Sequence, residues 1–175
     1  AWRDRRFEYF GARSEGKIRR AVEELTQRGG DIYWCPNVFT TPRRIRDGVT
    51  GGRFLYADLD AVDPDEIDPS LKPTVAWKSS HSRFQALWRL EEPLPADRLE
   101  ELNQRMSYAL GADKSGWDLT QYLRIPGTLN HKYDPPQPGE LLWATGPPYP
   151  VETLETLVPS VAETADAAKA HDDRQ

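Results

Sequence analysis

Two aspartates separated by a single residue, Asp58 and Asp60, end a stretch of alternating residues at 53–60. In a β-strand, residues i and i+2 point to the same face and lie about 6.6 Å apart. Carboxylates placed in this way can bind a pair of metal ions held roughly 3.5–4 Å apart. Without a cation, two charges about 4 Å apart cost on the order of 4 kcal/mol at an effective dielectric of 20. The pair therefore predicts a metal site or a basic partner, or else an exposed strand end that enters an acidic turn.

A serine-rich and basic segment, 78–83, joins the next two predicted strands, 74–77 and 84–90, in a hairpin. Its hydroxyl and cationic groups suit the oxygens of a phosphate, although serine-rich turns also form for purely local hydrogen-bonding reasons. The candidate groups in the segment are Lys78, Ser79, Ser80 and His81.

Three arginines, Arg43, Arg44 and Arg46, lie in a predicted loop at 40–52, directly before the acidic strand. The net charge of −5 argues against a general polyanion binder, but screening limits each local field to about 8–10 Å at physiological salt. The arginines are therefore candidates for binding a nucleic-acid strand, or alternatively ordinary surface charges.

A third acidic residue, Asp118, lies in the segment 117–127, which we expect to form a short helix or turn closed by a Pro-Gly pair. Asp118 is a candidate metal ligand. Its spacing from Ser115 also matches a capping box, in which the carboxylate would bind only a backbone N–H.

Helices and strands are expected around these residues as follows. Apolar residues at helical spacing predict a helix that begins after Ser14 and ends at Gly29-Gly30. A second helix is predicted from Leu99 to Leu110, with a capping box formed by Asp97 and Glu100. The further predictions are strands at 7–10, 31–35 and 140–145 and a final helix around 151–157.

The composition describes one globular domain with a polar tail. A chain of 175 residues suits a single domain, which we place at 1–158, and residues 159–175 are expected to form a disordered acidic tail. No apolar run approaches the roughly 18–20 residues of a membrane span, so no membrane partner is expected. The single cysteine, Cys35, cannot form an internal disulfide, which predicts a cytoplasmic location.

Three sequence features occur in a fixed order: ADLD at 57–60, FQALWRL at 84–90 after the basic hairpin, and WDLTQYLRIPGTLNHK at 117–132. Together they resemble the archaeo-eukaryotic primase-polymerase superfamily, in particular the RepB-like primase domains of plasmids and phages. That family combines a DxD or DxE, a Ser-x-His or a relative, a lone acid, and a following R-(L/I/V)-P-G-T-x-N-x-K signature. The resemblance covers roughly residues 7–158. It implies an α/β fold in which an N-terminal αβ unit joins an RRM-like, mainly antiparallel sheet, with the catalytic cleft between them.

The resemblance also implies roles for individual residues. Asp58, Asp60 and Asp118 would hold two Mg²⁺ or Mn²⁺ ions and carry the catalysis, and the loop arginines would guide the template. The groups expected to bind the nucleotide are Lys78, Ser79, Ser80, Gln85, Arg124, His131 and Lys132. Where many members of the family have the histidine of the second motif, this chain has Gln85. His81 lies on a different register, so either residue could serve that motif.

The implied function is primer synthesis on single-stranded DNA from nucleoside triphosphates in plasmid or phage replication, with extension of DNA as a further possibility and a fused or separate helicase as a partner. A replication-initiation module that binds single-stranded DNA without catalysis is the alternative. A DxD glycosyltransferase is disfavoured by the short chain and by the third motif.

Overall fold

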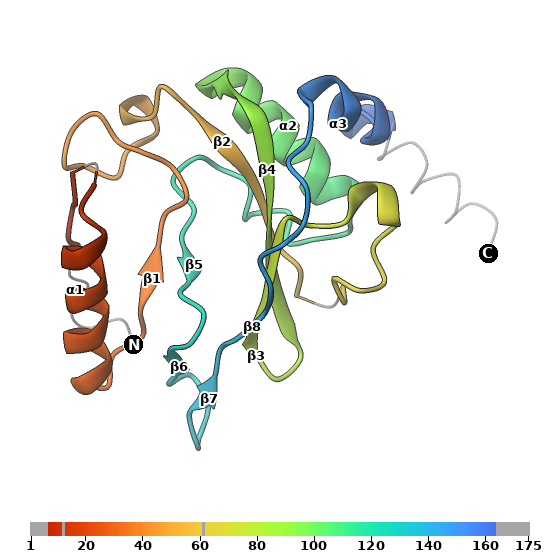
Figure 1. Cartoon of the computed structure of the whole chain (residues 1–175). Coiled ribbons are helices and arrows are strands. Elements are labelled where there is room, and N and C mark those ends of the chain that lie inside the picture. Colours follow the sequence, from red (N-terminus) through yellow and green to blue (C-terminus); the bar gives the residue numbers. More distant parts are fainter. Residues whose placement is uncertain (1–6, 12, 61, 164–175) are drawn as a thin grey trace.

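The structure, a computed structural model, describes residues 7–11, 13–60 and 62–163. Its centre is an antiparallel sheet in the order β2-β4-β3-β8, and the mixed α/β class with antiparallel sheets is as expected (Figure 1). The strands of this sheet are β2 (Gly51–Asp58), β3 (Val75–Ser80), β4 (Arg83–Pro95) and β8 (Glu140–Trp143).

Two small antiparallel pairs and three α-helices complete the described part of the chain. The pairs join β1 (Tyr33–Trp34) to β5 (Leu123–Arg124) and β6 (Leu129–Asn130) to β7 (Gln137–Pro138). The helices are α1 (Glu15–Gln27), α2 (Ala96–Ala109) and α3 (Val151–Leu157), with 3₁₀ turns at Arg46–Gly48 and Pro69–Leu71. None of the described helices combines the length and apolar character that a membrane crossing requires.

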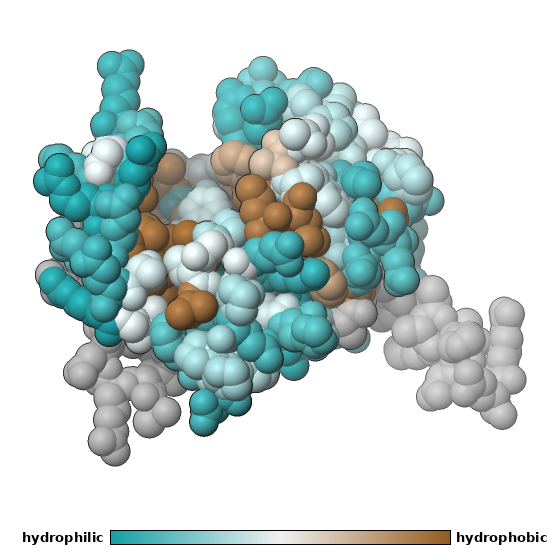
Figure 2. Space-filling view, turned by 60° about the horizontal axis from the view of Figure 1, so that its bottom comes forward, coloured by the Kyte–Doolittle hydropathy of each residue, from teal (hydrophilic) through white to brown (hydrophobic). Residues whose placement is uncertain are grey.

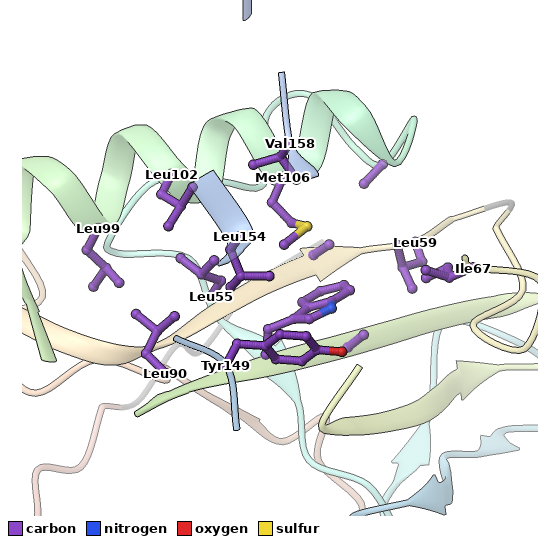
Figure 3. Close-up of a cluster of buried hydrophobic side chains, with 14 of the residues drawn as sticks. Leu55, Leu59, Ile67, Leu90, Leu99, Leu102, Met106, Tyr149, Leu154 and Val158 are labelled. Atoms are coloured by element: carbon purple, nitrogen blue, oxygen red, sulfur yellow. The ribbon is translucent and has the colours of Figure 1, made fainter. Parts of the chain in front are cut away.

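The main core lies between the sheet and helices α2 and α3. Leu55, Ala57 and Leu59 alternate along β2 and just beyond it, and all three are fully buried in this core, as predicted. Figure 3 shows Leu55 below the helical layer and Leu59 beside Ile67. Burial of each leucine side chain contributes roughly 1.5–3 kcal/mol. The helices contribute Leu99, Leu102, Met106 and Leu154 to the same core.

The opposite face of the sheet carries a second apolar cluster, formed by Tyr56, Trp77, Leu87 and Leu123. Leu123 belongs to β5, so this cluster attaches the β1–β5 pair to the sheet. Tyr56 is on the face of β2 that the alternation assigned to Asp58. It is nevertheless fully buried, because β5 and its flanking turns cover this part of the face.

The hairpin between β3 and β4 is tighter than predicted. The expected connection at 78–83 shrinks to two residues, His81 and Ser82, because β3 continues to Ser80 and β4 begins at Arg83. Ser79 and Ser80 are therefore buried strand residues rather than loop residues.

Helix α1 forms where it was predicted, and Gly29 ends it with a φ of 70°. All thirteen residues of α1 are described, and none of them is buried. Figure 2 shows hydrophobic residues in a hollow between the part of the molecule that contains α1 and the main body. The strand expected at 7–10 is wrong: the described residues 7–11 pair with no strand, and Phe7, Tyr9 and Phe10 are exposed.

One local prediction around α2 is also wrong. The helix begins after Pro95 and has no side-chain cap, so the predicted capping box does not form. Asp97 and Glu100 instead pair with Arg46, whose guanidinium is within reach of both carboxylates. The segment 117–127, expected to form a short helix or a turn, forms turns and strand β5, because Leu123 and Arg124 pair with β1.

In the C-terminal part of the described chain, the predictions of one strand and one helix are confirmed. Helix α3 and strand β8 lie within the predicted ranges. Residues 161–163 are helical, and Ser160 Oγ accepts a hydrogen bond from the Glu163 N–H. The rest of the predicted tail, 164–175, lies outside the described residues.

Candidate active site

A cavity of about 160 Å³ lies where the end of β2, the β3–β4 hairpin, β5 and the segment after β6 meet. The side chains that line it are almost all polar or charged. They are Tyr33, Asp58, Asp60, Ser79, Arg83, Gln85, Arg124, Asn130, Lys132 and Tyr133.

The two aspartates of the DxD face this cavity but differ in their surroundings. Asp58 ends β2 and is half-buried, whereas Asp60 is exposed and forms an ion pair with Arg83. Burial, followed by the charge of Asp60, raises the pKa of Asp58 to about 6. A cation placed between the two carboxylates would relieve both the repulsion and the cost of burying a charge.

Gln85 is a buried residue of β4 with its carboxamide at the wall of the cavity. Its Oε1 accepts hydrogen bonds from the Trp77 indole N–H at 3.2 Å and from the Arg124 backbone N–H at 2.9 Å. Its Nε2 donates to Asp58 Oδ2 at 3.4 Å. The amide is therefore already bonded to protein groups on both sides.

Arg124, a predicted nucleotide ligand, also lines the cavity but is committed to the fold. Only 4% of its side chain is exposed. The guanidinium donates to Asp31 Oδ1 at 2.8 Å, to the Leu129 carbonyl at 3.0 Å and to the Tyr33 hydroxyl at 2.7 Å. It also lies 4.6 Å from the centre of the Tyr33 ring. This arginine fixes β1 relative to the segment that follows β5.

Two other predicted ligands remain available at the cavity. Lys132 is exposed, and the part of the chain that the structure describes gives its ammonium no carboxylate partner. Ser79 Oγ donates to the Arg83 carbonyl at 3.3 Å and can still accept a hydrogen bond.

Several predicted site residues do not line the cavity. Lys78 pairs with Glu140 across β3 and β8 at 3.4 Å, and Ser80 Oγ donates to the Tyr133 hydroxyl at 3.4 Å. The alternative second-motif residue, His81, donates its backbone N–H to Gln137 Oε1 at 2.9 Å. His131 lies beside Asp31: its buried Nδ1 is 3.7 Å from Asp31 Oδ1, and the described residues give this atom no hydrogen bond.

The loop arginines are only partly free for a ligand. Arg46 is paired with two acids of α2. Arg44 donates to the Thr120 carbonyl and lies over the Tyr122 ring at 4.7 Å. Arg43 is exposed.

Asp118 also lies away from the cavity lining. Its Oδ1 accepts hydrogen bonds from the Thr120 backbone N–H at 2.8 Å and the Thr120 hydroxyl at 2.5 Å, and its carbonyl accepts from the Tyr56 hydroxyl. Its expected capping partner Ser115 bonds to Asp113 instead.

The structure brings one acid close to Asp58 that the sequence reasoning missed. The Asp113 backbone N–H donates to the Asp58 carbonyl at 2.9 Å, and the Asp113 charge contributes to the raised pKa of Asp58. Four further lining residues were not among the predicted site residues: Arg83, Tyr33, Asn130 and Tyr133. Asn130 is part of the recognised RIPGTLNHK signature, so that motif could have revealed it. Tyr33 becomes a neighbour only through the pairing of β1 with β5.

A family model described as the RepB DNA-primase N-terminal domain matches residues 46–143, more than half of the chain. The chain belongs to this family. It is a RepB-like domain of the primase-polymerase type, as its motifs indicated. No curated protein matches it.

Solved primases share the fold of this RepB-like domain. The AEP domain of the cyanophage S-2L primase-polymerase matches with a TM-score of 0.66 and 14% identity over 80% of this chain and 76% of that chain. The catalytic domain of primase RepB′ in complex with initiator DNA matches with a TM-score of 0.63 and 15% identity, over 95% of this chain and 81% of that chain. The crystal structure of primase RepB′ matches with a TM-score of 0.63 and 14% identity, over 94% of this chain but only 55% of that chain.

The acidic pair of the domain fits a divalent cation that is shared with a substrate. Among the described residues, no three or more His, Cys, Asp or Glu side chains are grouped as a metal cage. Mg²⁺, however, is usually held by one or two carboxylates together with substrate phosphates and water. Two neighbouring carboxylates in a polar cavity, one with a raised pKa, match this mode of binding.

Proposed function

We propose that this domain synthesises primers on a single-stranded DNA template by metal-dependent nucleotidyl transfer. Membership of the RepB DNA-primase family supports the reaction class. The observation that carries the proposal is the placement of Asp58 and Asp60 in a cavity that also contains Arg83 and Lys132. This arrangement combines carboxylates for a hard cation with cations for a triphosphate.

The roles follow from the contacts of each side chain. Asp58 and Asp60 would hold Mg²⁺ or Mn²⁺, two ions as in other two-metal enzymes, and the bound metal would activate the attacking hydroxyl and neutralise charge on the leaving pyrophosphate. Lys132 and Ser79 would bind triphosphate oxygens directly. Arg83 would join them when its partner Asp60 is engaged elsewhere. Arg124 would act by keeping β1 in place.

Two residues compete for the role of a third acid. The motif favours Asp118, whereas Asp113 is the acid whose backbone N–H bonds to Asp58 and whose charge acts on that carboxylate; neither acid lines the cavity. We assign the role to Asp113 on this ground.

The DNA partner is also part of the proposal. The similar catalytic domain of primase RepB′ forms a complex with initiator DNA, which supports a DNA strand as the partner of this domain. We propose that exposed Arg43 contacts the template, that residues 1–158 suffice for catalysis, and that a fused or separate helicase acts with the domain. We also propose a cytoplasmic location, on the ground of this reaction and its partners.

The test is primer synthesis without a supplied primer. The protein is incubated with single-stranded DNA, Mg²⁺ or Mn²⁺ and labelled nucleotides, alongside Asp58→Asn and Asp60→Asn. We expect labelled oligonucleotides from the wild type and none from either variant. Synthesis by both variants at the wild-type rate would refute the metal assignment. Binding of single-stranded DNA without synthesis by the wild type would favour the non-catalytic initiation module.

A further inference from the structure

Gln85 occupies the middle of a row of side chains that crosses three strands. In the register of the sheet, Gln85 of β4 lies opposite Asp58 of β2 on one side and opposite Trp77 of β3 on the other. Directly opposed residues of antiparallel strands have their side chains on the same face. The acid, the amide and the indole are therefore neighbours in one line.

The hydrogen bonds along this row allow only one orientation of the Gln85 carboxamide. The two groups at its oxygen, the Trp77 indole N–H and the Arg124 backbone N–H, are donors only. A flipped amide would place its NH₂ group against both donors and its oxygen against the Asp58 carboxylate. Such a flip would lose three hydrogen bonds in a residue that is 5% exposed. The amide nitrogen is thus held toward Asp58.

Trp77 has no direct access to a ligand. It is 1% exposed, belongs to the second apolar cluster, and is not part of the cavity lining. Any influence of its indole N–H on the cavity must pass through Gln85.

We propose that Trp77 and Gln85 are positioning residues that orient the Asp58 carboxylate for metal binding. The inference rests on the proposed function in taking Asp58 as a metal ligand. Trp77 fixes the amide, and the amide fixes the carboxylate oxygen that it contacts. Loss of either group weakens metal binding and turnover, and at saturating metal it leaves the affinity for nucleotide unchanged. Gln85 is then not the nucleotide ligand that the second motif of the family implied.

The first test replaces Gln85 by methionine, which has a similar length but cannot form these hydrogen bonds. Mn²⁺ binding to the metal-free protein is measured by calorimetry, with Asp58→Asn to show that the site is the one observed. We expect the Kd of Gln85→Met for Mn²⁺ to rise about tenfold or more, the typical effect of removing the partner of a ligand. In primer synthesis, kcat should fall while the KM for nucleotide changes by less than about twofold. The matched control is Gln104→Met on α2, which covers the opposite face of the sheet.

The second test uses a pair of tryptophans and does not depend on the stability of Gln85→Met. Trp77→Phe removes the indole donor from Gln85, whereas Trp88→Phe removes an equally buried indole that donates to the Leu71 carbonyl at 2.6 Å in the main core. Both variants lose apolar contacts. Only Trp77→Phe is expected to raise the Kd for Mn²⁺.

The outcomes separate this inference from the proposed function. A wild-type protein that binds Mn²⁺ but makes no primers would refute primer synthesis, and the positioning role would still be decided by the Kd values. The positioning role would be overturned if Trp77→Phe and Trp88→Phe had equal Kd values for Mn²⁺. It would also be overturned if Gln85→Met bound Mn²⁺ as the wild type does but had a raised KM for nucleotide. A wild-type protein that binds no Mn²⁺ would overturn it as well.

Discussion

Asp58 and Asp60 are two residues apart but have different electrostatic roles in the metal-free protein. Asp60 is exposed and its charge is balanced by Arg83, whereas Asp58 is half-buried and its pKa is raised to about 6. Ionised Asp58 therefore destabilises the fold at neutral pH, and a bound cation would remove this cost.

Asp58→Asn is expected to increase the free energy of unfolding of the metal-free protein at pH 7.5 by about 1–3 kcal/mol. The native state retains the Asp58 proton up to about pH 6, while an unfolded aspartate loses it near 3.8. The stability that protonated Asp58 contributes to the wild type is fully present below pH 3.8 and is lost as the pH rises through 6. The difference in free energy of unfolding between Asp58→Asn and the wild type should therefore be absent near pH 4. Urea unfolding at the two pH values measures it. An Asp58→Asn variant that is less stable than the wild type at pH 7.5 would contradict the prediction. The control is Asp60→Asn, which lies at an exposed ion pair and should change the free energy of unfolding by less than about 1 kcal/mol.

Two variants, Asp113→Asn and Asp118→Asn, test which residue serves as the third catalytic acid beside Asp58 and Asp60. Asp113→Asn is expected to lower the rate of primer synthesis about tenfold or more, because Asp113 lies next to Asp58. Asp118→Asn should retain most of the rate, since the asparagine oxygen can still accept both hydrogen bonds from Thr120. Initial rates with saturating template compare the two. The reverse order of effects would restore Asp118, as the motif alone suggested.

At the scale of elements, the loop before β2 holds its arginines unequally. Arg44 and Arg46 are bonded to Thr120 and to the acids of α2, while Arg43 is exposed. The loop is therefore attached to the fold by two of the arginines that its sequence offered to DNA.

Arg43→Ala alone is expected to reduce the salt dependence of single-strand binding by about 0.7 units of slope, the value for one lost phosphate contact. Adding Arg44→Ala and Arg46→Ala should change the slope little further, because those guanidiniums already have protein partners. Titration of a fluorescent oligonucleotide at several salt concentrations gives the slopes. If the slope is unchanged in the triple variant, the loop does not contact the template.

Strand β5 depends on Arg124 for its attachment to β1. Arg124→Lys is expected to lower the free energy of unfolding by about 2–4 kcal/mol, because a single ammonium cannot replace three directed hydrogen bonds in a buried site. Arg98→Lys, at an ion pair with Glu155 that is 55% exposed on the arginine side, is the control and should cost less than about 1 kcal/mol. Denaturant unfolding compares them, and equal losses would show that the Arg124 contacts are not the source of the effect.

At the scale of the whole molecule, the sequence predicted those features that depend on local pattern. Alternation along β2 gave the buried residues Leu55, Ala57 and Leu59, and helical spacing gave α1, α2 and α3. Features that depend on distant partners were not predictable in this way. Asp97 pairs with Arg46 across 51 residues rather than capping its own helix.

The same distinction applies to the site. The motifs identified Asp58, Asp60, Gln85 and Lys132, all of which line the cavity. They could not show that the Arg124 guanidinium is bonded to Asp31, 93 residues away in the sequence, nor that Arg83 pairs with Asp60. Charge and spacing indicate which residues can bind a phosphate. Burial decides which of them are free to do so.

The central position of β4 has a consequence for how the molecule unfolds. Neighbouring residues within 85–88 of this strand serve different parts of the structure: Gln85 reaches the cavity, Leu87 joins the second cluster, and Trp88 joins the main core. Neither core can be lost while β4 stays in place, so global unfolding should be one cooperative event. Fluorine NMR of protein labelled with fluorotryptophan would follow Trp77 and Trp88 separately during urea denaturation, and we expect the two midpoints to coincide. Separate midpoints would mean that a state with one core intact is populated, and such a state would have lost the row of residues that holds Asp58.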